Sequence, residues 1–217
     1  RLVVLTNIPT PYRTHFFNRL RKALDKEHIE FIVLFCAQSE HDRHWAFIAD
    51  DLEFEHRILK GIHPRIGGVT FHVNPAVGSW LRRRRPTWLL SAGAWLMPTG
   101  ILALAALWDQ QCVRLFWSEG HQDAVIHPKG LVARLRRRVL RSYDGFAVPN
   151  KKSAEYLARE LGRQPLTILL PNTVDDTYFV PPSEQKRAEA REEHGFAVND
   201  IVFVQVAQFE DRKGVKE

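Results

Sequence analysis

Short apolar runs that alternate with segments of helical periodicity constrain the fold of this chain more than any other feature. Residues 29–35 have almost no polar interruption, which is typical of a strand whose sheet is covered on both faces. Residues 16–24 instead place apolar side chains three and four positions apart, as an amphipathic helix does. Because strands and helices keep alternating, we predict an α/β fold built on a doubly wound parallel sheet. The remaining expected strands are residues 2–5, 54–59, 69–73, 88–90, 113–117, 146–148, 166–170 and 201–206, and the remaining expected helices are residues 77–84, 101–108, 131–141, 153–161 and 184–194.

The composition is that of a soluble globular protein with a modest positive charge. The 217 residues suffice for one full domain and the start of a second. Lys and Arg total 31 against 25 Asp and Glu, a net charge of +6, which favours a phosphate-bearing, nucleic-acid or anionic-lipid partner. Cys36 and Cys112 lie far apart in the sequence. We therefore expect reduced thiols and a cytoplasmic chain, with a disulfide as the less favoured alternative.

The uncharged stretch 87–108 has two interpretations. A run of this length without charge is a candidate membrane span, and the arginines at 82–85 would suit its cytoplasmic flank. However, Ser91, Gly93 and Pro98 interrupt the run where a strand, a loop and a helix would meet. We favour a buried strand–loop–helix unit and keep the membrane span as the alternative.

Several common nucleotide-binding and hydrolytic motifs do not occur in the sequence. There is no G-x-G-x-x-G after the first strand, no G-x-x-x-x-G-K-[ST] and no G-x-S-x-G, which disfavours dehydrogenases, P-loop NTPases and α/β-hydrolases. Gly67 and Gly68 are expected to form a turn. His41 and His44 lie in a charged, irregular stretch without cysteine, so a solvated loop is favoured over a metal site.

Arginines cluster in two segments, at 82–85 and within the expected helix 131–141. On that helix Leu131, Leu135 and Val139 are expected to face the core, with the arginines in solvent. The simplest interpretation of both segments is a solvated basic surface.

An anionic membrane surface is the second interpretation of these arginines, because Trp80 and Trp88 flank the first cluster. A nucleic-acid partner is disfavoured, since no recognised binding motif is present and the arginines do not alternate with exposed aromatic residues. The arginines expected to meet a membrane are Arg82, Arg83, Arg84, Arg85, Arg134, Arg137 and Arg138.

Candidate site residues follow the expected strands, because ligands of parallel sheets gather at the carboxyl ends of the strands. Arg13 opens the first helix and offers a forked donor suited to carboxylate or phosphate, although an ordinary surface arginine fits equally well. Glu119 and His121 follow the strand at 113–117. They are suited to position or polarise a substrate hydroxyl, or alternatively to cap the next element.

The end of the sequence carries a more specific pattern. The segment 171–175 reads PNTVD and is followed by Phe179 and Pro181, which are typical of the end of one α/β unit. The expected strand 201–206 then leads to a turn at Lys213 and Gly214. Such a turn can hold a phosphate, because lysine supplies charge and glycine lets backbone N–H groups come close.

Together with the opening strand and its Pro11-Tyr12-Arg13 turn, this pattern resembles the family-4 retaining glycosyltransferases (glycosyl transferase group 1), which have the GT-B architecture. The resemblance implies two Rossmann-like domains, with the acceptor in the N-terminal domain and the sugar donor in the C-terminal one. Residues 1–180 would form the acceptor-side domain. Residues 181–217 would form the linker and the truncated start of the donor-binding domain, so that this chain alone would be inactive.

The resemblance also implies roles for individual residues. Lys213 would neutralise the donor diphosphate. Gln208 stands where the family usually has an arginine, and Arg212 is a candidate to replace that arginine. Glu119 and His121 are the candidate catalytic residues. No metal or other cofactor is implied. The residues expected to shape the acceptor pocket are Pro11, Tyr12, Arg13, Gly93 and Trp95.

The sequence thus predicts an enzyme that transfers a sugar, with retention, from a nucleotide diphosphate sugar to a saccharide or lipid-linked acceptor. It would serve polysaccharide or glycolipid biosynthesis in the cytoplasm, with the inner membrane face as a candidate location. Two alternatives stay open: a non-hydrolysing sugar-nucleotide epimerase of the same architecture, and a basic module that binds membranes or nucleic acid.

Overall fold

The computed structural model describes the chain except for residues 42, 44–48, 126, 176, 178 and 206–217. The chain divides into two compact units, Arg1–Asp175 and Asp176–Glu217, and each is described by itself.

The first unit is built on a seven-stranded sheet with the strand order β3-β2-β1-β6-β7-β8-β9. Every pair of neighbouring strands in it is parallel. The predicted doubly wound, Rossmann-like α/β fold is therefore confirmed. The strands of this sheet are β1 (Leu2–Thr6), β2 (Phe31–Phe35), β3 (Glu55–Ile58), β6 (Trp88–Ala92), β7 (Val113–Trp117), β8 (Gly145–Val148) and β9 (Thr167–Leu169).

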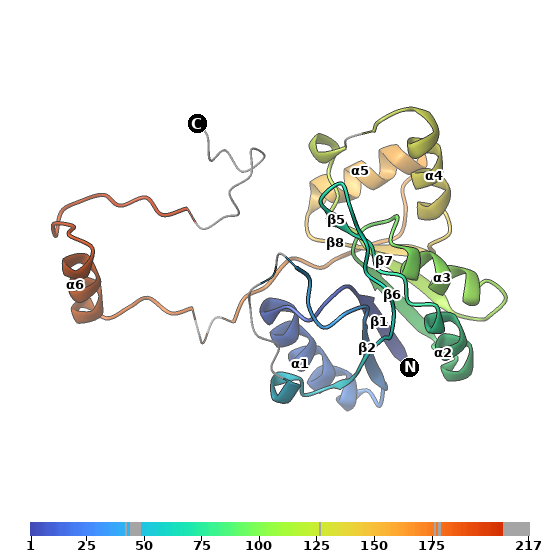
Figure 1. Cartoon of the computed structure of the whole chain (residues 1–217), viewed down its shortest axis with the longest axis horizontal. Coiled ribbons are helices and arrows are strands. Elements are labelled where there is room, and N and C mark those ends of the chain that lie inside the picture. The colour runs from blue at the N-terminus through green and yellow to red at the C-terminus, as the bar shows by residue number, and fades with distance from the viewer. Residues whose placement is uncertain (42, 44–48, 126, 176, 178, 206–217) are drawn as a thin grey trace. The chain divides into compact units, whose positions relative to one another are not determined.

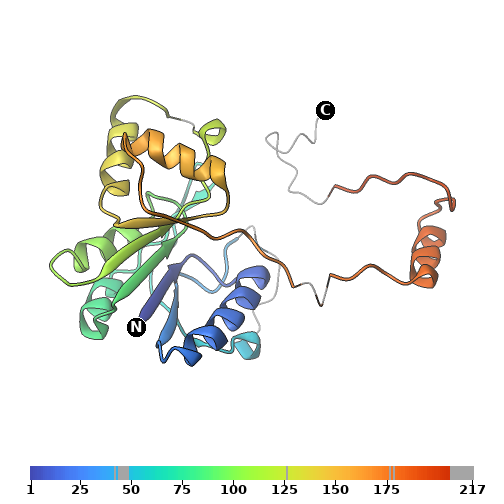
Figure 2. The same ribbon diagram turned by 180° about the vertical axis from the view of Figure 1, so that it is seen from behind.

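Helices lie on both faces of this sheet, as Figure 1 and, from behind, Figure 2 show. Their packing follows the alternation of side chains along the strands, which sends successive residues to opposite faces. Two short 3₁₀ helices, η1 (Ala49–Asp51) and η2 (Gln122–Ala124), lie in the loops. The α-helices of the first unit are α1 (Pro11–Lys26), α2 (Ala76–Arg84), α3 (Pro98–Ala106), α4 (Gly130–Leu140) and α5 (Lys151–Leu161).

Helix α1 covers one face of the sheet through Phe17, which is fully buried. The Phe17 ring contacts Phe31, Phe54 and Trp117, with ring centroids 6.0, 5.7 and 6.5 Å away. Such tilted and edge-to-face pairs add to the stability gained from burying the apolar area. The helix begins at Pro11, because proline is well suited to the first turn.

The opposite face is covered by α2, α3, α4 and α5. Val77 and Leu81 of α2 and Ala103 of α3 pack on the β1 and β2 side chains of this face, and Leu140 and Leu157 continue the layer over β7 and β8. All five of these side chains are almost completely buried. The continuous apolar runs of β1 and β2 are thus explained by cover on both faces.

The uncharged stretch 87–108 forms β6, a loop and α3, so the strand–loop–helix interpretation is confirmed. The helix begins at Pro98, three residues earlier than predicted. Among the helices that the structure describes, none is both long and apolar enough to span a bilayer.

The strand predicted at 69–73 is shorter than expected and lies outside the main sheet. Its first two residues, Val69–Thr70 (β5), pair antiparallel with Arg65–Ile66 (β4) in a hairpin, and Val73 forms an isolated bridge with Ile62. Gly67 and Gly68 form the predicted turn, with φ angles of 57° and 79° that glycine tolerates best. The hairpin is an insertion between β3 and α2, which local propensity alone does not reveal.

The predicted orientation of α4 was also wrong. Leu131 and Leu135 are 79% and 45% exposed, whereas Arg136 is only 4% exposed and Val139 is buried as predicted. The cause is Glu160 of α5, whose buried carboxylate accepts two hydrogen bonds from the Arg136 guanidinium, each of 3.1 Å. A buried carboxylate needs such a partner, so α4 turns Arg136 inward and Leu131 outward.

The second unit contains α6 (Glu184–Glu193), close to the predicted helix at 184–194. Ser183 caps it by accepting a 3.3 Å hydrogen bond from the Lys186 N–H. The strand predicted at 201–206 was wrong for residues 201–205, which are not extended in a sheet, since no described segment of this unit offers them a hydrogen-bonded neighbour. The predicted donor residues Gln208, Arg212 and Lys213 lie outside the described residues.

Candidate functional site

The strand order has a switch point between β1 and β6, and the carboxyl edge of the sheet at this point is here called the crevice. From β1 the chain builds outward to β2 and β3, then returns to place β6 on the other side of β1. Parallel sheets bind ligands at such a switch point. Asn7 follows β1 and Gly93 follows β6, where a Cβ on Gly93 would lie 2.6 Å from Asn7 Oδ1. Gly93 also has a φ of 121°, so this close approach requires glycine.

Arg13 and Glu119 form an ion pair beside this crevice. The Arg13 guanidinium donates to Thr6 Oγ1 at 2.7 Å and to Glu119 Oε1 at 3.3 Å. It also lies over the Trp117 ring, 4.9 Å from the centroid. The Arg13 side chain is 12% exposed and that of Glu119 is 44% exposed. The rigidly held arginine therefore orients a carboxylate that is open to solvent.

Buried polar atoms without a hydrogen-bond partner among the described residues gather around the same pair. A buried polar group left unsatisfied is unfavourable by about 1 to 3 kcal/mol, so such groups are rare and mark places where a polar ligand or water binds. Arg13 was expected to shape the acceptor pocket, but these individual atoms were not identified from the sequence. They include Asn7 Oδ1, Thr10 Oγ1, Arg13 Nε, His15 Nε2 and Trp117 Nε1.

The other predicted acceptor residues lie around the two loops. Pro11 is exposed at the first position of α1. Tyr12 is 40% exposed, with its ring centroid 5.7 Å from the Arg13 guanidinium. Trp95, in the loop after β6, is partly buried and packs against the cluster over β7 and β8. No hydrogen bond between described residues joins Pro11 or Trp95 to Arg13 or Glu119.

His121 is placed differently from Glu119. Its ring is 50% exposed and its Nδ1 lies 3.9 Å from the Asp123 carboxylate. No hydrogen bond or ion pair between described residues joins His121 to Arg13 or Glu119. The structure therefore brings Arg13 and Glu119 together and leaves His121 outside this contact.

Two buried groups below the crevice are unsuited to act as nucleophiles. Burial raises the pKa of the Cys36 thiol to about 12, against a smaller lowering by its hydrogen bond with Thr99. Burial likewise raises the pKa of Tyr143 to about 12. Both groups stay protonated at neutral pH, where only the thiolate form of a cysteine is reactive. The cavity between them holds only about 10 Å³, the space of one water.

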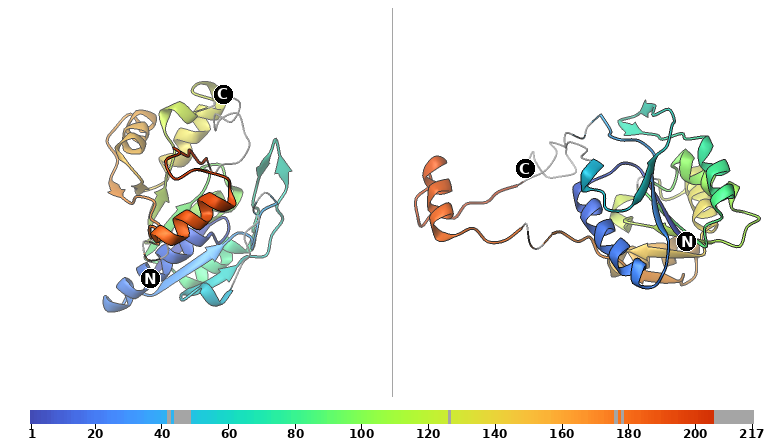
Figure 3. Two further views of the ribbon diagram at one scale, coloured as in Figure 1. Left: turned by 90° about the vertical axis from the view of Figure 1, so that its left-hand side faces the viewer. Right: turned by 90° about the horizontal axis from the view of Figure 1, so that it is seen from below.

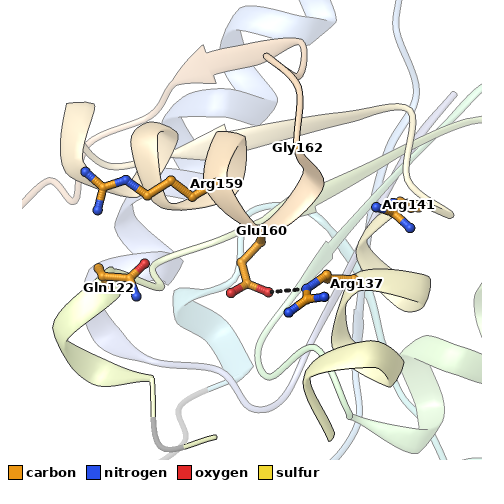
Figure 4. A pocket seen from close by; sticks show the side chains of 6 residues that line it. All are labelled: Gln122, Arg137, Arg141, Arg159, Glu160 and Gly162. Carbon is orange, nitrogen blue, oxygen red and sulfur yellow. Dashed lines mark ion pairs between the residues drawn. The ribbon is translucent and has the colours of Figure 1, made fainter. Parts of the chain in front are cut away.

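A second, basic site lies between α4 and α5, in a pocket of about 460 Å³ (Figure 4). Glu160 forms its floor and also pairs with Arg137, whose Nε lies 3.6 Å from Glu160 Oε2. The pocket is lined by Gln122, Arg137, Arg141, Arg159, Glu160 and Gly162.

A neighbouring hollow of about 670 Å³ continues this basic surface on the other side of α4. Trp108 lines it and is 73% exposed, a residue that the sequence interpretation placed at the end of a helix without a surface role. The Trp80 ring, by contrast, is buried, so the expectation that it flanks a membrane surface was wrong. This second hollow is lined by Trp108, Arg114, Arg134, Arg138, Arg141 and Ser142.

The arginines at 82–85 are exposed at the end of α2. Arg84 is engaged by carboxylates, 3.2 Å from Glu55 and 3.7 Å from Glu30, and the Arg82 Nε donates to the Ala106 carbonyl. Within the described part of the chain, no three His, Cys, Asp or Glu side chains gather as a metal site would require.

Comparison with solved structures supports the fold. The chain is similar to Anabaena HepE in complex with UDP and glucose, with a TM-score of 0.60 and 11% identity over 89% of this chain and 50% of that one. For HepE in complex with UDP-glucose the TM-score is 0.57 and the identity is 10%, over 89% of this chain and 50% of that one. For S. aureus MnaA with UDP the TM-score is 0.52 and the identity is 14%, over 87% of this chain and 50% of that one. No protein-family model and no curated protein sequence matches the chain.

This chain therefore spans about half the length of the structures that it resembles. At these identities the likeness establishes the fold, and the site has to be argued from its own residues.

Proposed function

We propose that the protein containing this chain is a glycosyltransferase, which moves a sugar with retention from a nucleotide diphosphate sugar to a saccharide or lipid-linked acceptor. The observation that carries this proposal is the Arg13–Glu119 pair at the switch-point crevice, surrounded by unsatisfied polar atoms. Two structures with the same fold, HepE and MnaA, hold UDP, and HepE also holds glucose, which supports a nucleotide sugar as the donor.

The site residues suit the binding of a polyhydroxylated acceptor. Glu119 can accept hydrogen bonds from sugar hydroxyls, while Arg13 holds the carboxylate in place. In the transfer, the bond between the sugar C1 and the diphosphate oxygen breaks and the acceptor oxygen bonds to C1. The nucleoside diphosphate leaves with the electron pair of the broken bond, and its phosphate oxygen takes up the proton of the acceptor hydroxyl. We assign binding of that diphosphate to Lys213, Arg212 and Gln208, and propose no bound metal.

A sugar-nucleotide epimerase is the second candidate, and Glu119 is the observation that favours it. An exposed carboxylate at the crevice could act as an acid or base on the donor sugar itself, without an acceptor. The two candidates differ in whether turnover requires an acceptor.

The experiment uses the full-length protein with UDP-, GDP- and ADP-sugars and a lipid and oligosaccharide extract as acceptor. The expected result is release of nucleoside diphosphate that depends on both a particular donor and the extract. The 217-residue chain alone serves as the control and is expected to give no turnover. Interconversion of sugar nucleotides without extract would identify an epimerase, and turnover by the short chain would overturn the assignment of the donor site.

We also propose that the surface of α4 meets an anionic membrane, where a lipid-linked acceptor would be found. Leu131 and Leu135 are exposed on this helix, and the exposed Trp108 lies with Arg134 and Arg138 in the neighbouring hollow. Exposed leucine and tryptophan beside arginine form the pattern of an interfacial helix. Arg82, Arg83, Arg84, Arg85 and Arg137 are the further arginines that we assign to this contact.

Replacing Arg134 and Arg138 together by glutamine is expected to weaken binding to vesicles containing phosphatidylserine about 30-fold. Each lost arginine removes about 1 kcal/mol of attraction to the anionic surface. The matched control is Arg19→Gln with Lys22→Gln on α1, which changes the net charge equally. Vesicle sedimentation at two salt concentrations measures the effect, and equal losses in both double variants would contradict a specific α4 contact.

A further inference from the structure

The hairpin β4–β5 presents two histidines that the proposed chemistry does not use. The pairs Arg65 with Thr70 and Ile66 with Val69, extended by the bridge between Ile62 and Val73, fix the register of the hairpin. In this register residues 63 and 72 lie directly opposite each other, where cross-strand side chains make contact. Figure 3 shows the hairpin in teal, standing out beside the main sheet.

His63 and His72 form a hydrogen-bonded chain with Glu40. The Nδ1 atoms of the two rings are 2.9 Å apart, and His72 Nε2 lies 2.8 Å from Glu40 Oε1. His72 is completely buried, the Glu40 side chain is 18% exposed and His63 is exposed. The buried His72 thus contacts the exposed His63 ring through Nδ1, while its Nε2 contacts Glu40.

The backbone around His72 is anchored over the carboxyl ends of the strands. Its carbonyl accepts a 2.8 Å hydrogen bond from Thr99 Oγ1, at the start of α3. Asn74, two residues later, donates to the carbonyls of Cys36 and Leu59, which follow β2 and β3. The relay of Glu40, His72 and His63 therefore lies at the same edge of the sheet as Arg13 and Glu119.

The contacts restrict which nitrogen of each ring carries the proton. A neutral His72 that donates to the Glu40 carboxylate through Nε2–H keeps a lone pair on Nδ1. His63 then donates to that lone pair through Nδ1–H, which leaves the lone pair of His63 on Nε2. Burial, the largest cause, lowers the pKa of His63 below its usual value, which favours the neutral ring.

We propose that His63 is an acceptor-binding residue whose Nε2 accepts a hydrogen bond from a sugar hydroxyl, with Glu40 and His72 as the positioning residues that fix its ring. A structural role alone does not explain this arrangement, because a hydrogen bond to an exposed ring adds little to stability. An oriented lone pair at the carboxyl edge is, however, what recognition of a hydroxyl requires. The nature of the ligand rests on the proposed transferase function.

The test uses the full-length enzyme and the acceptor extract of the donor experiment. His63→Leu is expected to raise the apparent acceptor KM about tenfold, the effect of one lost hydrogen bond, without changing the Kd for UDP. His63→Gln keeps an oxygen that accepts hydrogen bonds and should raise the acceptor KM much less. Glu40→Ala should raise the KM several-fold, whereas Glu40→Gln, which can still accept from His72, should restore it. His28→Gln, at the opposite edge of the sheet, is the control.

An unchanged acceptor KM in His63→Leu would overturn the proposal, as would a loss of the same size in His28→Gln. The tautomers of the ¹⁵N-labelled wild-type protein provide a second, independent measurement. An unprotonated Nε2 on His63 at pH 7 is expected, and a protonated one would overturn the relay. If the wild-type enzyme transfers no sugar, the proposed function and the sugar hydroxyl assignment fail together, while the spectra still decide the relay.

Discussion

Replacing Arg136 by leucine is expected to destabilise the first unit by about 3 to 5 kcal/mol, the usual effect of removing one partner of a buried ion pair. The Glu160 side chain, only 9% exposed, would lose both of its hydrogen bonds from Arg136. The His127 carbonyl would also lose the Arg136 Nη1 donor at 3.1 Å. Among the described residues, Arg137, at 3.6 Å, would remain beside the carboxylate.

Chemical denaturation of the full-length protein measures this effect. Arg21→Leu is the matched control, because Arg21 pairs with Asp25 at 2.9 Å while both side chains are about half exposed (43% and 50%). That change should destabilise the protein by no more than about 1 kcal/mol. The double variant Arg136→Leu with Glu160→Leu removes the unpaired charge and should recover much of the loss. Equal effects in Arg136→Leu and Arg21→Leu would contradict the buried pair.

Replacing Arg13 by alanine is expected to lower kcat/KM for the acceptor about 10- to 100-fold, as losing a charge-assisted hydrogen bond does. Glu119 would lose the guanidinium that orients its carboxylate, and Thr6 would lose a donor at 2.7 Å. Arg13→Lys should lose nearly as much activity. A single ammonium group cannot reach both oxygens while it also covers the Trp117 ring.

Steady-state kinetics with the full-length enzyme measure this change, and denaturation curves show whether the variant is folded. Glu119→Gln keeps the shape of the side chain but removes its charge, so it should lose activity in the same direction as Arg13→Ala. Arg57→Ala, on the edge strand β3, is the control. Unchanged kcat/KM in a folded Arg13→Ala variant would contradict the assignment of this pair to the acceptor site.

The parallel sheet could be predicted because its signal is local. Residues 31–35 are fully buried as β2, and a strand with both faces covered must be apolar at every position. The inserted hairpin β4–β5 could not be placed, because its strands have only two residues each and their pairing depends on register. The prediction of the α4 orientation failed for a different reason. Its inward face is decided by Glu160, which lies 24 residues after Arg136.

The candidate site shows the same division between local and long-range information. Arg13 and Glu119 were each predicted from their position after a strand, but they are 106 residues apart. Their contact follows from the strand order, which brings the ends of β1 and β7 to one edge. Glu40 and His72 are 32 residues apart, and nothing in their local sequence marks them as partners. Pairs of this kind become visible only when the topology is known.

Transfer of a ¹³C-labelled sugar by the full-length protein, followed by NMR, tests the central claim most directly. The nucleotide sugar that the donor experiment identifies would be labelled and incubated with the acceptor extract, and the anomeric signals of donor and product would be observed over time. We expect the nucleoside diphosphate to appear together with a product of the same anomeric configuration as the donor, and only when the extract is present. Conversion of the donor to an epimer without extract, or a product of inverted configuration, would contradict the proposed transfer with retention.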